Sequence, residues 1–99
     1  MFFFNKTNIN RALEEYRNTS GAVLLDVREA EEFYSGHIPG AVNVPLSAIY
    51  NISIPKNSIL FVYCLRGTRS RRAVIILKRM GYNARSIGGI VSYKGQTKR

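Results

Sequence analysis

Residues 59–72, ILFVYCLRGTRSRR, contain an apolar run, a cysteine and an arginine-rich loop in direct succession. The run from Ile59 to Tyr63 holds two β-branched and two aromatic residues, which is typical of a strand buried on both faces. A helix is predicted after the loop, because Ser70 is a common N-cap residue and Gly81 stands where a C-terminal glycine is expected. Between them, apolar residues recur at the spacing of one helix face, at Ala73, Ile76, Leu77 and Met80.

Cys64 therefore stands between a strand end and a helix N-terminus, a setting that stabilises anions. Backbone N–H groups of a tight loop can turn inward as a nest, and a helix N-terminus carries about half a positive charge. Arg66 and Arg69 add cations in the loop, and Arg71 and Arg72 add them in the first helical turn. On these residues alone two interpretations stay open: a reactive thiolate in an anion-binding cradle, or an inert buried cysteine of the common kind.

The composition indicates one globular domain over residues 1–99, of which 45% are hydrophobic. A single cysteine allows no internal disulfide, and with a single histidine it cannot form a zinc cluster without carboxylates. The N-terminal MFFF lacks the basic region of a signal peptide, and no apolar run reaches the roughly 20 residues that span a bilayer. We therefore expect a cytoplasmic monomer without a metal, another cofactor or contact with a membrane.

Charge is distributed unevenly along this chain, whose net charge is +9. All six acids lie between Glu14 and Glu32, whereas 11 of the 15 Lys and Arg residues follow Phe33. Such a basic region can attract small anions, acidic proteins or nucleic acid. It can equally be the solvated surface of a protein with a high isoelectric point, and the sequence leaves these alternatives open.

Apolar strands alternate with helices in the rest of the chain, which predicts an α/β fold with a mainly parallel sheet. Strands are expected at 22–27, 41–44 and 84–87, with Gly88-Gly89 ending the last one, and segment 2–4 is either a short first strand or an apolar anchor. Helices are expected at 9–18, with Thr7 or Asn8 as the cap, and at 29–34. Short helical turns are expected at 46–50 and 90–94, and residues 96–99 form a polar tail that is expected to fray.

Two predicted strands end in side chains with chemical potential. Asp26 and Arg28 lie at the end of one strand, and Cys64 follows another. Because ligands bind such sheets beyond the C-terminal ends of the strands, we expect these three side chains at one edge of the sheet.

Several motifs, in their order along the chain, resemble a single rhodanese domain. They are Leu25-Asp26-Val27-Arg28, Glu32-Phe33, GHIPGAVNVP at 36–45, Tyr63-Cys64, Gly67, Arg69-Ser70, Leu77, Gly81-Tyr82 and Gly88-Gly89-Ile90. The resemblance covers nearly everything from Val23 to Gly95. It implies a five-stranded, mostly parallel sheet flanked by helices on both faces. It also implies a cysteine that carries a persulfide sulfur between a donor and an acceptor.

The loop length separates two branches that share this fold. The loop of the sulfurtransferases looks like Cys-x4-Arg, as found from Cys64 to Arg69. The loop of the related dual-specificity phosphatases looks like Cys-x5-Arg, which is one residue longer and fits a phosphate. The chain departs from the family at Tyr93, where a Trp is usual, and at Arg66, where a small or polar residue is common.

The resulting candidate site has a catalytic residue, Cys64, and a supporting shell of Asp26 and Arg28. The expected substrate-binding cradle consists of Leu65, Arg66, Gly67, Thr68, Arg69 and Ser70. Arg69 is the foremost candidate for contact with an anionic donor, and Arg66 is the second candidate. Gly67 is expected to supply a backbone with positive φ. His37 lies in a turn motif and is interpreted as structural.

The expected function is a sulfurtransferase that moves a sulfane sulfur from thiosulfate or a persulfide to an external acceptor, namely cyanide, a small thiol or a protein cysteine. Three alternatives remain. A phosphatase or arsenate reductase-like enzyme is disfavoured by the loop length. A non-catalytic sulfur carrier or protein-interaction module would keep the cysteine. A sulfur donor that contacts tRNA is suggested only by the basic residues.

Overall fold

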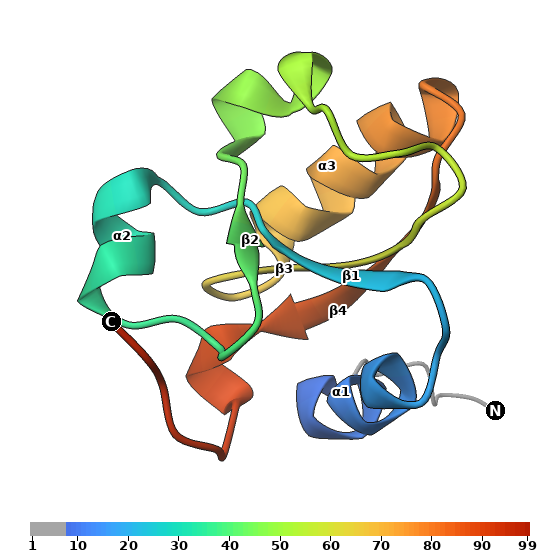
Figure 1. Ribbon diagram of the computed structural model, residues 1–99. Coiled ribbons are helices and arrows are strands. Elements are labelled where there is room, and N and C mark those ends of the chain that lie inside the picture. Colours follow the sequence, from blue (N-terminus) through green and yellow to red (C-terminus); the bar gives the residue numbers. More distant parts are fainter. Residues whose placement is uncertain (1–7) are drawn as a thin grey trace, which may run out of the picture.

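A sheet of four strands forms the centre of the computed structural model, which describes residues 8–99 (Figure 1). The strands are β1 (Ala22–Asp26), β2 (Val42–Asn43), β3 (Ile59–Cys64) and β4 (Asn83–Gly89), in the order β2-β1-β3-β4. Every pairing between them is parallel, which confirms the predicted α/β class. The described residues hold four strands where five were predicted; the predicted segment 2–4 and Thr7 lie outside them.

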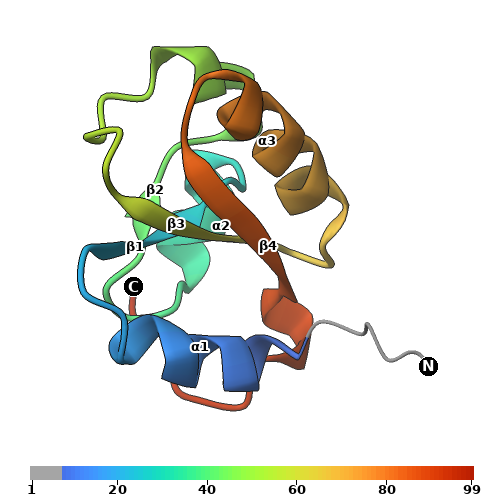
Figure 2. The ribbon, with the colours of Figure 1, turned by 90° about the vertical axis from the view of Figure 1, so that its right-hand side faces the viewer.

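Helices cover both faces of this sheet, as Figure 2 shows. Helix α1 (Ile9–Arg17) packs on β1 and β4, whereas α3 (Thr68–Arg79) and the 3-10 helix η1 (Leu46–Asn51) lie on the opposite face. The short helix α2 (Ala30–Ser35) follows β1, and a second 3-10 helix, η2 (Ile90–Ser92), follows β4. Among residues 8–99, no helix has the length and hydropathy needed to cross a membrane.

Strand β3 is central, which explains its uninterrupted apolar sequence. Leu60, Val62 and Cys64 belong to the core between the sheet and α3. Phe61 and Tyr63 belong to the core between the sheet and α1. Successive side chains of a strand point to opposite faces, so both faces of β3 must be apolar. The same alternation directs Cys64 toward the α3 side.

The two ends of α3 show where local signals succeed and fail. The C-terminus agrees with prediction, since Gly81 follows the helix with φ +99° and its N–H donates to Lys78 O at 3.0 Å. The predicted N-cap is wrong, because α3 begins at Thr68 and Gly67, with φ +110°, is the N-cap residue. Ser70 lies inside the first turn instead, where its hydroxyl donates to Gly67 O at 2.9 Å.

Two further boundaries differ from the predictions at the C-terminal side of the sheet. The glycines Gly88-Gly89 were expected to end the last strand, but β4 continues through both, with a register shift opposite Val62/Tyr63 that accommodates one extra residue. The tail at 96–99 was expected to fray, but Lys98 pairs with His37 through two backbone hydrogen bonds of 2.8 Å.

At the N-terminal side, Asn8 is confirmed as a helix cap. Its side-chain oxygen accepts hydrogen bonds from the N–H groups of Asn10 at 3.0 Å and Arg11 at 3.4 Å. Helix α2 begins one residue later than predicted, because Glu29 has extended backbone and serves as the N-cap residue.

Candidate active site

The sulfur of Cys64 lies at the point where β3 ends and α3 begins. Its Sγ accepts hydrogen bonds from the backbone N–H groups of Gly67, at 3.0 Å, and Ser70, at 3.3 Å. The residue is only 1% exposed. A buried sulfur with N–H donors and a helix N-terminus directed at it is in an environment that favours negative charge.

The loop around the sulfur depends on two glycines and one serine. Gly67 has φ +110°, which a residue with a side chain rarely adopts. Ser70 links the turn to the sheet, because its hydroxyl contacts both Gly67 O and the hydroxyl of Ser86, the latter at 2.7 Å. Gly89 lies against the loop so closely that a Cβ there would stand 2.2 Å from Leu65 O. The end of β4 therefore acts as a floor for the loop.

A pocket of about 170 Å³ opens at this loop. The residues that line it are Cys64, Leu65, Arg66, Thr68 and Arg69. A single water needs at least about 10–15 Å³ of such space, so the pocket has room for a small anion beside the sulfur. The structure thus brings the predicted cradle together, with Gly67 and Ser70 buried and in contact with the sulfur through their N–H groups.

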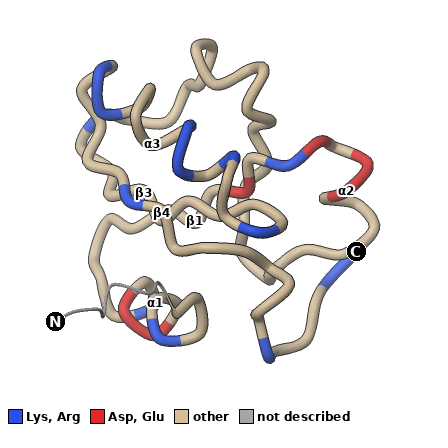
Figure 3. The backbone as a smooth tube through the Cα atoms, turned by 180° about the vertical axis from the view of Figure 1, so that it is seen from behind, with Lys and Arg blue, Asp and Glu red and all other residues tan. Residues whose placement is uncertain are grey.

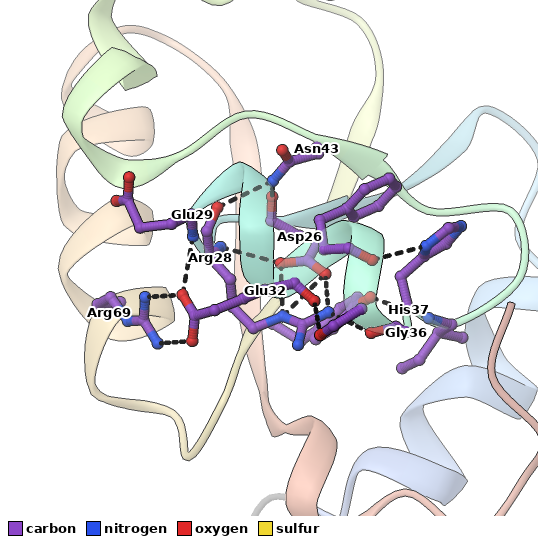
Figure 4. Close-up of polar contacts among 12 residues, drawn as sticks. Asp26, Arg28, Glu29, Glu32, Gly36, His37, Asn43 and Arg69 are labelled. Carbon is purple, nitrogen blue, oxygen red and sulfur yellow. Dashed lines mark hydrogen bonds and ion pairs between the residues drawn. The ribbon is translucent and has the colours of Figure 1, made fainter. Parts of the chain in front are cut away.

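Arg69 lies at the pocket, but it is already paired (Figure 4). Both of its terminal nitrogens donate to the carboxylate of Glu32 in α2, at 2.6 and 2.9 Å. The hydrogen bonds from Arg69 lower the pKa of Glu32 to about 2, and the pKa of Arg69 is raised for the same reason. Sequence reasoning missed Glu32 as a site residue, although Glu32-Phe33 is one of the motifs that carry the family resemblance.

Asp26 and Arg28 form a second, fully buried ion pair behind α2. Arg28 donates to the Asp26 carboxylate from Nε at 3.1 Å and from Nη2 at 2.7 Å, and Nη2 also donates to Gly36 O at 2.8 Å. Burial works against the charge of Arg28, but its hydrogen bonds to Asp26 and the negative charge of that carboxylate outweigh this effect, so the pKa of Arg28 is raised. Neither residue lines the pocket, so the pair fixes the two ends of α2 rather than contacting a ligand.

His37 and Tyr63 have structural surroundings. The His37 ring stacks on Phe33 at a centroid distance of 3.8 Å, and its Nδ1 lies 3.0 Å from Phe33 O. The Tyr63 hydroxyl accepts a hydrogen bond from Ile38 N at 3.1 Å, and burial raises the pKa of Tyr63. Both residues hold the turn that follows α2, as expected for His37. Among residues 8–99, no three His, Cys, Asp or Glu side chains gather in a way that could hold a metal ion.

Comparison with known proteins assigns this arrangement to a family. The model of the rhodanese-like domain matches residues 10–96. The chain belongs to the rhodanese-like domain family. Its fold resembles that of the human single-domain sulfurtransferase TSTD1, with a TM-score of 0.73 and 28% identity over 84% of this chain and 89% of that one.

Two curated relatives are both named as sulfurtransferases, one of them as part of a much longer protein. The chain is 37% identical to the thiosulfate sulfurtransferase PspE of Escherichia coli over 67% of its length and 68% of that protein. It is 31% identical to the adenylyltransferase and sulfurtransferase uba4 of Ogataea parapolymorpha over 86% of its length, but spans only 23% of that longer protein. Together with the family match, these relatives support a sulfurtransferase activity at the level of the family.

Proposed function

We propose that this rhodanese-like chain is a sulfurtransferase that carries a sulfane sulfur as a persulfide on Cys64. One observation carries the proposal. The Cys64 sulfur accepts hydrogen bonds from the N–H groups of Gly67 and Ser70 at the N-terminus of α3, and it adjoins an open pocket. An inert core cysteine requires neither the N–H donors nor the pocket. The two interpretations left open by the sequence are thus weighted toward the reactive thiolate.

In the loading step, the Cys64 thiolate attacks the outer, sulfane sulfur of thiosulfate. The sulfur–sulfur bond of thiosulfate breaks, its electron pair leaves with sulfite, and a new sulfur–sulfur bond forms at Cys64. The terminal sulfur of this persulfide carries negative charge. We expect backbone N–H groups of residues 65–70 to hold that charge, as an oxyanion hole does.

In the unloading step, a nucleophilic acceptor attacks the terminal sulfur. The sulfur–sulfur bond breaks, and its electron pair returns to Cys64 as a thiolate. With cyanide the product is thiocyanate; with a thiol it is a new persulfide. Since Cys64 is the only cysteine of the chain, a thiol acceptor must come from another molecule.

Arg66 is the better candidate for the cation that attracts an anionic donor, which reverses the order expected from the sequence. Arg69 is neutralised by Glu32 through two hydrogen bonds. Arg66 lines the same pocket, is exposed, and makes no ion pair with any acid of the described chain. We assign Asp26 and Arg28 a positioning role, because they hold α2 and hence Glu32.

Two alternatives receive less support. A phosphatase or arsenate reductase-like enzyme would need a longer loop than the one from Cys64 to Arg69. A sulfur carrier without turnover would use the same persulfide, so only multiple turnover separates it from an enzyme.

The deciding experiment is the intact mass of the protein after incubation with thiosulfate. We expect a gain of one sulfur, about 32 Da, that disappears on addition of cyanide and is absent in Cys64→Ser. Thiocyanate formed in excess over the protein would identify an enzyme rather than a carrier. If neither thiosulfate nor polysulfide adds sulfur, or if Cys64→Ser gains the same mass, the proposal is wrong.

A further inference from the structure

The solvent-facing side of α3 combines positive charge with an apolar centre. Ile75 is 53% exposed, and exposed cations precede and follow it by three or four residues along the helix. These cations are Arg71, Arg72, Lys78 and Arg79. Figure 3 shows Lys and Arg along α3, whereas Asp and Glu gather around α1, α2 and the end of β1. We call Ile75 and these four cations the α3 face.

No acid of this chain forms an ion pair with a cation of the α3 face. All six acids lie within the described residues, and three of them pair with Arg28, Arg69 and Arg85. None of the ion pairs in the described chain involves the α3 face. Arg71 moreover lies at the end of the first turn of α3, where a cation opposes the helix dipole. An acidic partner would relieve both the mutual repulsion of these cations and this unfavourable placement.

The α3 face is continuous with the mouth of the pocket. An Arg71 terminal nitrogen lies 3.1 Å from the position that a Cβ on Gly67 would occupy, so this guanidinium folds back beside Gly67 of the cradle. Exposed Arg66 and Thr68 line the pocket next to it. A molecule that covers the α3 face would therefore extend at its Arg71 end to the pocket that adjoins Cys64.

We propose that the α3 face docks an acidic surface of a protein that presents the acceptor cysteine to the Cys64 persulfide. This inference rests on the proposed sulfurtransferase function. Charge complementarity selects an acidic partner, and four exposed cations around an apolar residue suit a protein surface better than cyanide or a small thiol. Among the residues of α3, no aromatic side chain is present to stack on a base, and Ile75 provides the apolar centre that protein interfaces combine with arginine.

The transfer across this surface exchanges one sulfur–sulfur bond for another. The partner's thiolate attacks the terminal sulfur of the Cys64 persulfide, and the existing sulfur–sulfur bond breaks. Its electron pair restores the Cys64 thiolate, while a new sulfur–sulfur bond forms on the partner's cysteine. No oxidant or reductant is consumed.

The test uses the full chain and three synthetic peptides of equal length, each with one central cysteine flanked by Glu, Gln or Lys. The protein is first loaded with thiosulfate, and sulfur transfer to each peptide is followed by mass. The variant Arg72→Glu/Arg79→Glu reverses two charges on either side of Ile75. The matched control Arg11→Glu/Arg17→Glu makes the same change in net charge on exposed positions of α1, across the sheet.

We expect the Arg72→Glu/Arg79→Glu variant to transfer sulfur to the Glu peptide on the order of tenfold more slowly than the wild type at low salt. The loss should shrink at high salt and for the Gln peptide, and Arg11→Glu/Arg17→Glu should stay within about twofold of the wild type. Each comparison uses one peptide with different proteins, so the intrinsic reactivity of the peptide thiol cancels.

Cyanide as acceptor separates the two proposals, because it needs no docking surface. Normal thiocyanate formation together with equal losses in both double variants, or with a loss for Arg72→Glu/Arg79→Glu that is as large for the Gln peptide as for the Glu peptide, would overturn the docking proposal alone. Failure to load or to form thiocyanate would overturn the proposed function and the docking proposal with it. Single-stranded RNA serves as a last arm: if the Arg72→Glu/Arg79→Glu variant loses RNA binding but not transfer to the Glu peptide, the face belongs to nucleic acid and the docking proposal is wrong.

Discussion

The C-terminal ends of β1 and β3 lie side by side, since Asp26 pairs with Tyr63, yet they have opposite characters. At the end of β1, the charges of Asp26 and Arg28 neutralise each other and are 0% and 4% exposed. At the end of β3, the Cys64 sulfur faces N–H donors and an open pocket. One strand end thus holds the scaffold in place, and its neighbour is left available for chemistry.

The largest effect on stability is expected at the end of β1, where the charges are buried and paired. Asp26→Ala leaves the Arg28 guanidinium buried without its carboxylate, so the free energy of unfolding should fall by about 3–5 kcal/mol. Glu15→Ala is a matched control, because the Glu15–Arg85 pair has the same 2.7 Å separation but is 57% and 45% exposed. Urea denaturation should show a loss below about 1 kcal/mol for this control. Equal losses in both variants would contradict the view that burial distinguishes the two pairs.

The end of β3 should instead be sensitive to the shape of the β4 segment that lies under the Cys64 loop. Gly89→Ala would place a Cβ 2.2 Å from Leu65 O, so the Cys64 loop must shift, although the φ of −128° at Gly89 suits any residue. We expect a loss of about 1–3 kcal/mol in stability and, from displacement of the sulfur, a fall in thiocyanate formation of about 100-fold.

Gly21→Ala separates this clash from backbone strain. Gly21 has φ +77° with nothing within 4 Å of a Cβ, so the variant should lose about 1 kcal/mol of stability and keep its turnover at 25 °C. If Gly89→Ala is as active as Gly21→Ala, the floor does not position the loop.

The two arginines of the pocket provide a finer comparison. Arg66→Gln should raise the KM for thiosulfate on the order of tenfold with little change in kcat, because it removes the uncompensated cation. The double variant Glu32→Gln/Arg69→Gln removes a charge of each sign, so steady-state kinetics should show a change of less than about threefold. A larger rise in KM for the double variant than for Arg66→Gln would make Arg69 the donor-binding cation.

Much of this arrangement is predictable from local sequence. The apolar run before Cys64 predicts β3, and the recurring apolar residues after it predict α3 and hence the position of the sulfur. The N-terminus of α3 was misplaced because Ser70 has the propensity of a cap, whereas the loop needs the positive φ of Gly67 and uses the Ser70 hydroxyl to tie that turn to the sheet.

The remainder depends on contacts between distant segments. Glu32 and Arg69 are 37 positions apart. No charge pattern along the chain reveals that α2 places Glu32 within hydrogen-bond distance of Arg69. Gly88-Gly89 has the composition of a strand break, but the register shift opposite Val62/Tyr63 and the loop above Gly89 retain both glycines within β4. Such features follow from packing against neighbours rather than from local propensity.

The Glu32–Arg69 pair should make only a small contribution to the free energy of unfolding. That contribution should depend on pH. The pKa of Glu32 is about 2 in the folded chain against an ordinary 4.5, so the pair adds stability that is fully present above about pH 4.5 and is lost as the pH falls through 2. Because the two side chains are 31% and 30% exposed, Glu32→Gln should cost at most about 1 kcal/mol at pH 7. Urea denaturation from pH 7 to pH 2 should show the wild type and this variant converging, while Glu14→Gln, whose residue makes no ion pair in the described chain, stays parallel to the wild type. A difference between wild type and Glu32→Gln that persists unchanged at pH 2 would mean that the ion pair is not its source.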